Sequence, residues 1–298
     1  MKTTLYIFLA FVLVLTGCAE YEKEISWELD DHPDMLVVEG IITNEFRQQT
    51  VLLTKTSPYF DTLAPKIISG AGVLVREGGN TYFFTESATH KGLYLSDMPF
   101  VGEPFKTYEL EVTLQEPLNG VTDYDAVSKM PEGLDLDTII CEIYEMPDLG
   151  FEEDEEDKDT TILSIAFYGK EPDDPNNYYT ARIFQNKNCW NANVKEVFLY
   201  NDDNNNGNNL DYFIGIENVK AQDTIMLEIR SVEKNYYDFI NGIKLIDESG
   251  DAYSMSGPPA NAVGNISGGK ALGFFCAAYI SRATSVAVDM RGKKKMAE

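Results

Sequence analysis

Short apolar runs, each bounded by glycine, asparagine or proline, follow one another along the chain from Met35 onward. They are rich in valine, tyrosine, phenylalanine and threonine and recur about every ten residues, which is typical of β-strands. In the first half they occur at Leu36–Ile42, Thr50–Thr54, Gly72–Arg76, Thr81–Phe84, Gly92–Leu95, Thr107–Val112 and Tyr124–Val127. Gly78-Gly79-Asn80 predicts a tight hairpin turn between two of these strands. The spacing predicts an N-terminal Ig-like β-sandwich over residues 35–130.

Residues 131–298 continue the strand pattern but contain one segment of helical period. Strands are predicted at Asp137–Tyr144, Thr160–Tyr168, Tyr178–Phe184, Lys195–Tyr200, Leu210–Ile216, Asp223–Arg230, Leu272–Ala278 and Ser285–Met290. Helical spacing places one apolar face at Tyr236, Phe239, Ile240, Ile243, Leu245 and Ile246. We expect a helix near 232–248, with Ser231 as its N-cap and Gly250 as its stop. The fold is therefore predicted to be mainly β, its second antiparallel β domain carrying one amphipathic helix whose apolar face packs into a core.

The first 34 residues have a different pattern, which indicates a lipoprotein leader. Lys2 gives a short positive region, Leu5–Leu15 is apolar, and Leu15-Thr16-Gly17-Cys18 matches a bacterial lipobox. The apolar run is too short for a helix across a bilayer core of ~30 Å, which needs about 20 residues. We predict a signal peptide at 1–17, lipidation of Cys18 by acyl chains such as palmitate, and a polar tether at 18–34. Several acyl chains would hold the protein stably at a membrane.

The charge of the chain restricts its partners. The formal net charge is −25, while the 44% hydrophobic share is that of a protein with a core. So acidic a surface repels phosphate backbones, and no basic patch is present apart from a short terminal cluster at Arg291–Lys295. We therefore expect no nucleic-acid partner.

The residues that could carry catalysis do not form a recognisable motif. After Cys18 only Cys141, Cys189 and Cys276 remain, which allows at most one disulfide and leaves its pairing open. The only histidines are His32 and His90, and neither has an evident partner. There is no phosphate-binding loop, histidine metal motif or nucleophile elbow, so we expect neither a cofactor nor an enzyme. The alternative is a surface hydrolase, for example one that acts on glycans with an unrecognised carboxylate pair.

Two polar segments interrupt the strand pattern of the second half. One segment resembles the first half of a calcium loop and contains Asp202, Asn204, Asn206 and Asp211. The twelfth position, where a calcium loop has an acidic residue, is occupied by Phe213. Asparagine and glycine also form hairpin tips without a metal, and we favour that interpretation. The acidic run Glu152–Asp159 has no apolar period and is expected to be a solvated loop outside the core.

Several short motifs, in their order along the chain, resemble a known family. In the N-terminal half these are Leu36–Asn44, Thr56–Tyr59, Ile68–Ala71, Gly92–Tyr94 and Tyr108–Leu110, and in the C-terminal half they are Asp174–Tyr179, Gly264–Ile266 and Leu272–Phe275. The chain is similar over about Met35 to Val288 to the domain-of-unknown-function 4249 family of Bacteroidota outer-membrane lipoproteins. The resemblance implies an accessory role in uptake, because such proteins are often encoded beside TonB-dependent receptors. It supplies no catalytic residues.

Together, these features lead to one functional hypothesis. We expect a non-catalytic, lipid-anchored outer-membrane protein that binds a ligand or a TonB-dependent receptor. The acidic segment Glu20–Glu24 resembles the export signal of Bacteroidota surface lipoproteins, which favours the cell exterior.

Overall fold

A computed structural model describes residues 34–57, 65–145, 161–202, 212–217, 219–249, 262–267 and 271–291. The first half forms β1 (Leu36–Thr43), β2 (Thr50–Lys55), β3 (Lys66–Ile67), β4 (Gly72–Glu77), β5 (Asn80–Glu86), β6 (Leu93–Ser96), β7 (Thr107–Leu118) and β8 (Val121–Lys129). The second half forms β9 (Asp135–Glu145), β10 (Thr161–Lys170), β11 (Tyr178–Gln185), β12 (Asn188–Cys189), a 3-10 helix η1 (Val194–Glu196), β13 (Phe198–Asn201), β14 (Tyr212–Glu217), β15 (Thr224–Val232), helix α2 (Lys234–Ser249), β16 (Ala271–Val286) and β17 (Val288–Asp289).

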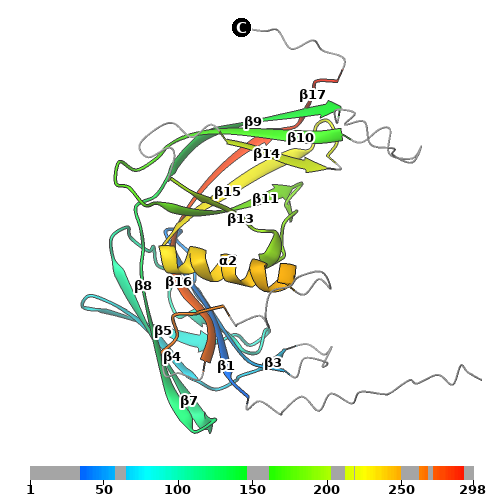
Figure 1. The fold of residues 1–298 in the computed structure, drawn as a ribbon. Coiled ribbons are helices and arrows are strands. Elements are labelled where there is room, and N and C mark those ends of the chain that lie inside the picture. The colour runs from blue at the N-terminus through cyan, green and yellow to red at the C-terminus, as the bar shows by residue number, and fades with distance from the viewer. Residues whose placement is uncertain are drawn as a thin grey trace, which may run out of the picture. The chain divides into compact units, whose positions relative to one another are not determined.

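The strands form two sheets, most of whose neighbours are antiparallel (Figure 1). The larger sheet has 13 strands in the order β12-β11-β15-β16-β1-β2-β6-β5-β4-β7-β8, with β13 beside β11 and β3 beside β2. The smaller sheet has the order β14-β10-β9-β17. This confirms the predicted mainly β fold with one amphipathic helix among the described residues. The predicted hairpin is also present, because Glu77 pairs with Asn80 across Gly78 and Gly79.

β16 is the strand that links the two halves of the larger sheet. Its first half pairs with β1 in parallel, and its second half pairs with β15 in antiparallel fashion. Two strands were predicted here, Leu272–Ala278 and Ser285–Met290, and the gap between them was wrong: β16 runs unbroken through Ala271–Val286, and the separate second strand is only β17, Val288–Asp289. The polar residues between them suggested a break, but they have partners in the fold. Ser281 accepts a hydrogen bond from the Leu136 amide at 3.0 Å, and Arg282 pairs with Glu228.

Two hydrophobic cores lie against the same face of β16. Phe275 and Ala277 pack in the first core, with residues of β1 to β8, whereas Ala283 packs in the second, with residues of β9 to β11 and β15. Both cores use residues of β16, so the larger sheet continues across the predicted boundary at residues 130/131. The division into two domains therefore stays a prediction.

Asn265 holds two strands that are not hydrogen-bonded neighbours in the sheet. Its side chain donates to the Val127 carbonyl of β8 at 3.0 Å and to the Phe275 carbonyl of β16 at 2.7 Å. It also accepts from the Phe275 amide at 2.9 Å. Gly264 allows this close approach, since a Cβ there would lie 1.9 Å from the Gly273 carbonyl oxygen. The amide of Asn265 thus takes the place of a strand neighbour.

The start of α2 differs from the expectation. Ser231 is not an N-cap: it belongs to β15, is buried, and accepts a hydrogen bond from the Leu134 amide at 3.0 Å. β15 continues to Val232. The backbone carbonyl of Glu233 then accepts the first hydrogen bonds of the helix, from the backbone amides of Tyr236 and Tyr237. Within the described parts of the chain, no helix combines the length and apolarity needed to span a membrane.

Candidate functional site

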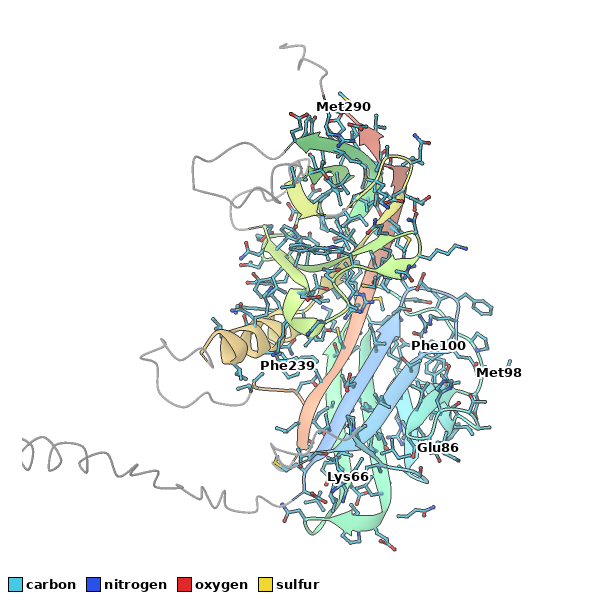
Figure 2. The ribbon with its side chains drawn as sticks, turned by 90° about the vertical axis from the view of Figure 1, so that its right-hand side faces the viewer. Lys66, Glu86, Met98, Phe100, Phe239 and Met290 are labelled. Atoms are coloured by element: carbon cyan, nitrogen blue, oxygen red, sulfur yellow. The ribbon has the colours of Figure 1, made fainter. Side chains whose placement is uncertain are left out.

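A cavity of about 630 Å³ lies beneath the apolar face of α2, between the helix and the face of the larger sheet that points away from the two cores. We call it the helix cavity. The helix contributes Tyr236, Phe239, Ile240, Ile243 and Ile246, so five of the six predicted apolar positions line it, while Leu245 is exposed. Figure 2 labels Phe239 on the side of α2 that is turned toward β16. The predicted stripe therefore packs on the sheet and also encloses a space.

The floor of the helix cavity is built by strand alternation. Leu272, Phe274 and Cys276 alternate along β16 with the core residues Phe275 and Ala277, and so point to the opposite face. Val37 and Ile41 of β1 extend this floor. The rings of Phe239 and Phe274 lie 5.2 Å apart, and Tyr236 meets Phe274 edge-on at 5.1 Å. The volume lies within the ~300–1,000 Å³ that is typical of small-molecule pockets.

Beside the apolar floor, Glu228 holds two arginines in a buried charge network. Its side chain is only 2% exposed. One carboxylate oxygen accepts from Arg230, with Nε at 2.7 Å, and the other accepts from Arg282, also with Nε at 2.7 Å. Arg282 pairs in turn with Glu45. Burial alone would raise the pKa of Glu228, but the two guanidinium groups outweigh it and hold that pKa below its usual value. Glu228 is therefore an ionised, fully engaged carboxylate.

Among the described residues, Arg182 is the cation of this region that has no counter-ion. It lies directly opposite Glu228 in the β11–β15 pairing, and its half-buried side chain lines the helix cavity, as does that of Arg230. Both oxygens of Glu228 are already occupied by Arg230 and Arg282. Within the described ranges, the Arg182 guanidinium makes no hydrogen bond and no ion pair. A half-buried cation without a partner is a binding group for an anion.

Two further polar groups face the helix cavity. Glu39 of β1 is exposed and is the register partner of Phe274 on β16. Arg182 lies across β15 from Arg282, which is eight residues further along β16 than Phe274. Glu39 therefore lies within the β1 part of the lining, and Val37 and Leu272 extend the lining beyond it. The Tyr236 hydroxyl makes no hydrogen bond to any described residue, and burial raises the pKa of Tyr236 to about 12. It is a neutral donor that points into an apolar space.

The predicted calcium residues are only partly described. Asn204, Asn206 and Asp211 lie outside the described residues. Asp202 is buried, and its carboxylate accepts a hydrogen bond from the side-chain amide of Asn177 at 3.2 Å. This bond joins the end of β13 to the start of β11. In the part of the chain that the structure describes, no group of three or more histidine, cysteine or acidic residues is arranged to hold a metal. Cys18, His32 and the acidic run Glu152–Asp159 also lie outside the described residues.

The three thiols downstream of Cys18 are free and not activated. Cys141 and Cys276 are buried and Cys189 is half-buried. Burial raises the pKa of all three, that of Cys141 to about 12, although Arg182 partly opposes the rise at Cys189. Since the thiolate is the nucleophile, these environments do not favour covalent catalysis. His90 is exposed, with its ring Nδ1 2.9 Å from the Thr89 hydroxyl.

A second surface feature is a group of exposed apolar side chains on two adjacent loops, which we call the apolar loop cluster. Phe46 follows β1, while Met98, Val101 and Phe105 precede β7, and their exposed fractions are 76%, 74%, 46% and 58%. Figure 2 labels Met98 and the neighbouring Phe100 at one side of the N-terminal half. The buried Gln49 side chain binds the loops together by donating to the Phe100 carbonyl at 2.8 Å and accepting from the Thr43 amide at 2.9 Å.

Sequence reasoning predicted the helical stripe but missed Arg182 and Arg230. Each follows an apolar residue of a strand, in Ala181-Arg182-Ile183 and in Ile229-Arg230-Ser231, and such alternation usually marks a solvent-facing position. The sequence did contain one usable indication. An amphipathic helix accompanies the two strands, and its apolar face must cover one face of the sheet.

Comparisons with known proteins identify a family but no function. A family described as "Domain of unknown function (DUF4249)" matches residues 22–284. No curated protein matches the chain. The solved structure "Cytokine receptor complex - Crystal form 1A" is 9% identical with a TM-score of 0.22, and the match covers 68% of this chain and 86% of that one. "Ca2+-stabilized adhesin helps an Antarctic bacterium reach out and bind ice" is 13% identical with a TM-score of 0.19, covering 68% of this chain and 46% of that one. At such low scores neither likeness bears on function.

Proposed function

We propose that this chain, which belongs to the DUF4249 family, is a non-catalytic binding protein anchored to the outer membrane by acyl chains on Cys18. Its role is that of an accessory component of a TonB-dependent uptake system, on the exterior of the cell. It would bind a small ligand, a receptor, or both.

The helix cavity is the observation that supports a binding function best. It is an apolar space of ligand size beneath a helix, with an arginine and a tyrosine hydroxyl directed into it. An apolar pocket with a few convergent polar groups is the usual form of a small-molecule site. The rival hydrolase needs two carboxylates ~5–9 Å apart in one pocket. Among the described lining residues Glu39 is the one carboxylate, so the cavity favours binding over hydrolysis.

The apolar loop cluster supports the receptor part of the proposal. Large exposed apolar patches are uncommon on monomers and mark interaction sites. The cluster follows the C-terminal end of β1, whereas the predicted tether joins its N-terminal end. A protein partner that reaches over the anchored molecule would meet these loops, and its own apolar surface would cover Phe46 and Met98.

Co-purification from detergent-solubilised membranes tests the proposed function. We expect the tagged chain to recover a TonB-dependent receptor, and Phe46→Ser combined with Met98→Ser to reduce that recovery at least fivefold. Ile67→Ser, at a position that is 47% exposed outside the cluster, is the matched control. Recovery of the chain without a receptor would count against this arm of the proposal.

The anchor is tested separately by Cys18→Ser. Loss of the acylated cysteine should release the protein from the membrane fraction or block its maturation. Retention of the unacylated variant in that fraction would contradict the anchor. Protease treatment of intact cells then tests the exterior location, since a protein on the inner side would be fully protected.

A further inference from the structure

We propose that the helix cavity binds an elongated amphipathic anion, with its acidic group at Arg182 and its apolar chain between α2 and β16. This inference rests on the proposed binding function, because it names the chemistry of the ligand for that site. It is carried by the combination of a half-buried arginine that has no counter-ion among the described residues and the apolar cavity that it lines.

The first step concerns charge. The chain carries a formal net charge of −25, so most of its surface repels anions. In the network around Glu228, however, three arginines (Arg182, Arg230 and Arg282) face two carboxylates (Glu45 and Glu228). The surplus positive charge is that of Arg182, and it is half-buried at the edge of the helix cavity. An acidic group there would supply the missing counter-ion, and the guanidinium fork fits a carboxylate with two parallel hydrogen bonds.

The second step concerns shape. The apolar lining extends from the level of Arg182 along β16 to Phe274 and Leu272, beneath the apolar face of α2. A short hydrophilic anion would leave this lining in contact with water, whereas an apolar chain would cover it. The exposed Glu39, at the level of Phe274, disfavours a second acidic group in that part of the lining. The site therefore fits a molecule with one acidic end and one apolar end, rather than a dicarboxylate or a cation.

The third step concerns selectivity between head groups. Arg230 is held by Glu228 and is neutralised in place, so it adds little net attraction, while the Tyr236 hydroxyl can donate to an oxygen but cannot neutralise charge. Preference for an acid over the matching alcohol should therefore depend on Arg182 alone. Binding of the apolar chain should depend on the cavity volume and not on Arg182.

The test uses the full chain and three probes with the same twelve-carbon tail: dodecanoate, dodecanol and dodecyltrimethylammonium. Each is titrated by displacement of the fluorescent anion anilinonaphthalene sulfonate. We expect dodecanoate to bind at least tenfold more tightly than dodecanol, and the ammonium compound to bind most weakly. Arg182→Met should remove the advantage of the acid over the alcohol, and Arg182→Lys should keep part of it. Arg47→Met, an arginine outside the helix cavity, should change nothing.

A second variant separates the inference from the proposed function. Ile243→Trp fills the space under α2 and should weaken the acid and the alcohol equally. If acid and alcohol bind wild type with equal affinity, or if Arg182→Met leaves the preference intact, the inference is overturned while the helix cavity remains a binding site. If no probe binds, the inference and the ligand part of the proposed function both fail, whereas recovery of the receptor would still be judged by co-purification.

Discussion

Replacing Glu228 with glutamine would leave Arg230 and Arg282 facing each other without their shared carboxylate. Glu228 is 2% exposed and makes its contacts with both arginines at 2.6–2.7 Å. Removing one partner of a buried ion pair costs about 3–5 kcal/mol. The side chains of Arg230 and Arg282 are 19% and 31% exposed, so water can partly replace the lost carboxylate. We therefore expect a loss near the lower limit, about 3 kcal/mol of unfolding free energy, or roughly 6 °C in melting temperature.

The pH dependence of this loss is a sharper measurement than its size. The pKa of Glu228 is lower in the folded protein than in the unfolded chain, so its contribution is complete at neutral pH and is lost as the pH falls through the folded pKa. Urea unfolding of wild type and Glu228→Gln at pH 7, 5 and 4 should show a difference that is constant from 7 to 5 and shrinks below ~4.3, the unfolded pKa of glutamate.

Glu45→Gln is the matched control, because Glu45 pairs with the same Arg282 but is 32% exposed. Its loss should stay below about 1 kcal/mol, as for other partly solvated pairs. The reasoning is refuted if the two variants lose equal stability at pH 7, or if the deficit of Glu228→Gln does not change with pH.

Three further predictions concern stability. Phe275→Ala, at a fully buried position of β16, should cost about 3–5 kcal/mol in urea unfolding, whereas Phe83→Ala, 59% exposed, should cost little; equal losses would contradict the assignment of Phe275 to a core. Asn265→Ala removes three hydrogen bonds of 2.7–3.0 Å and should lower the unfolding free energy by about 2–3 kcal/mol. Asn80→Ala, at a hairpin, is the control. An unchanged melting curve for Asn265→Ala would contradict this prediction. Asp202→Ala should lower the melting temperature equally with and without calcium; a calcium-dependent difference would revive the cation site.

Strand alternation located most of the fold, because it is a local property of the sequence. The β4–β5 hairpin was predicted from Gly78 and Gly79, and the apolar face of α2 from helical spacing. The N-cap was misplaced because Ser231 is equally suited to bond a neighbouring backbone amide, and only the tertiary structure selects Leu134 as its donor. The polar stretch inside β16 was likewise misinterpreted, since its partners come from distant strands.

The candidate site was beyond local prediction for a related reason. Arg182, Glu228 and Arg282 lie side by side because three strands pair in a particular register, and a shift of one residue in any of these strands would turn its own side chain to the opposite face. The motif residues Asn44 and Asn265 have a structural role that the sequence pattern alone does not reveal. In the structure, both side-chain amides bind the backbone of β16, Asn44 at Ile280 and Asn265 at Phe275.

The parallel pairing of β1 with β16 has a consequence for how the chain is made and exported. Asn44 and Ile280, at the end of this pairing, are 236 residues apart in sequence. Contacts of such long range slow folding, because the intervening chain must be ordered before they form. A chain that emerges N-terminus first exposes an open β1 edge until Ala271–Val286 has followed. Such edges pair readily with other chains, so β16, which is made long after β1, is the strand that protects the β1 edge from aggregation.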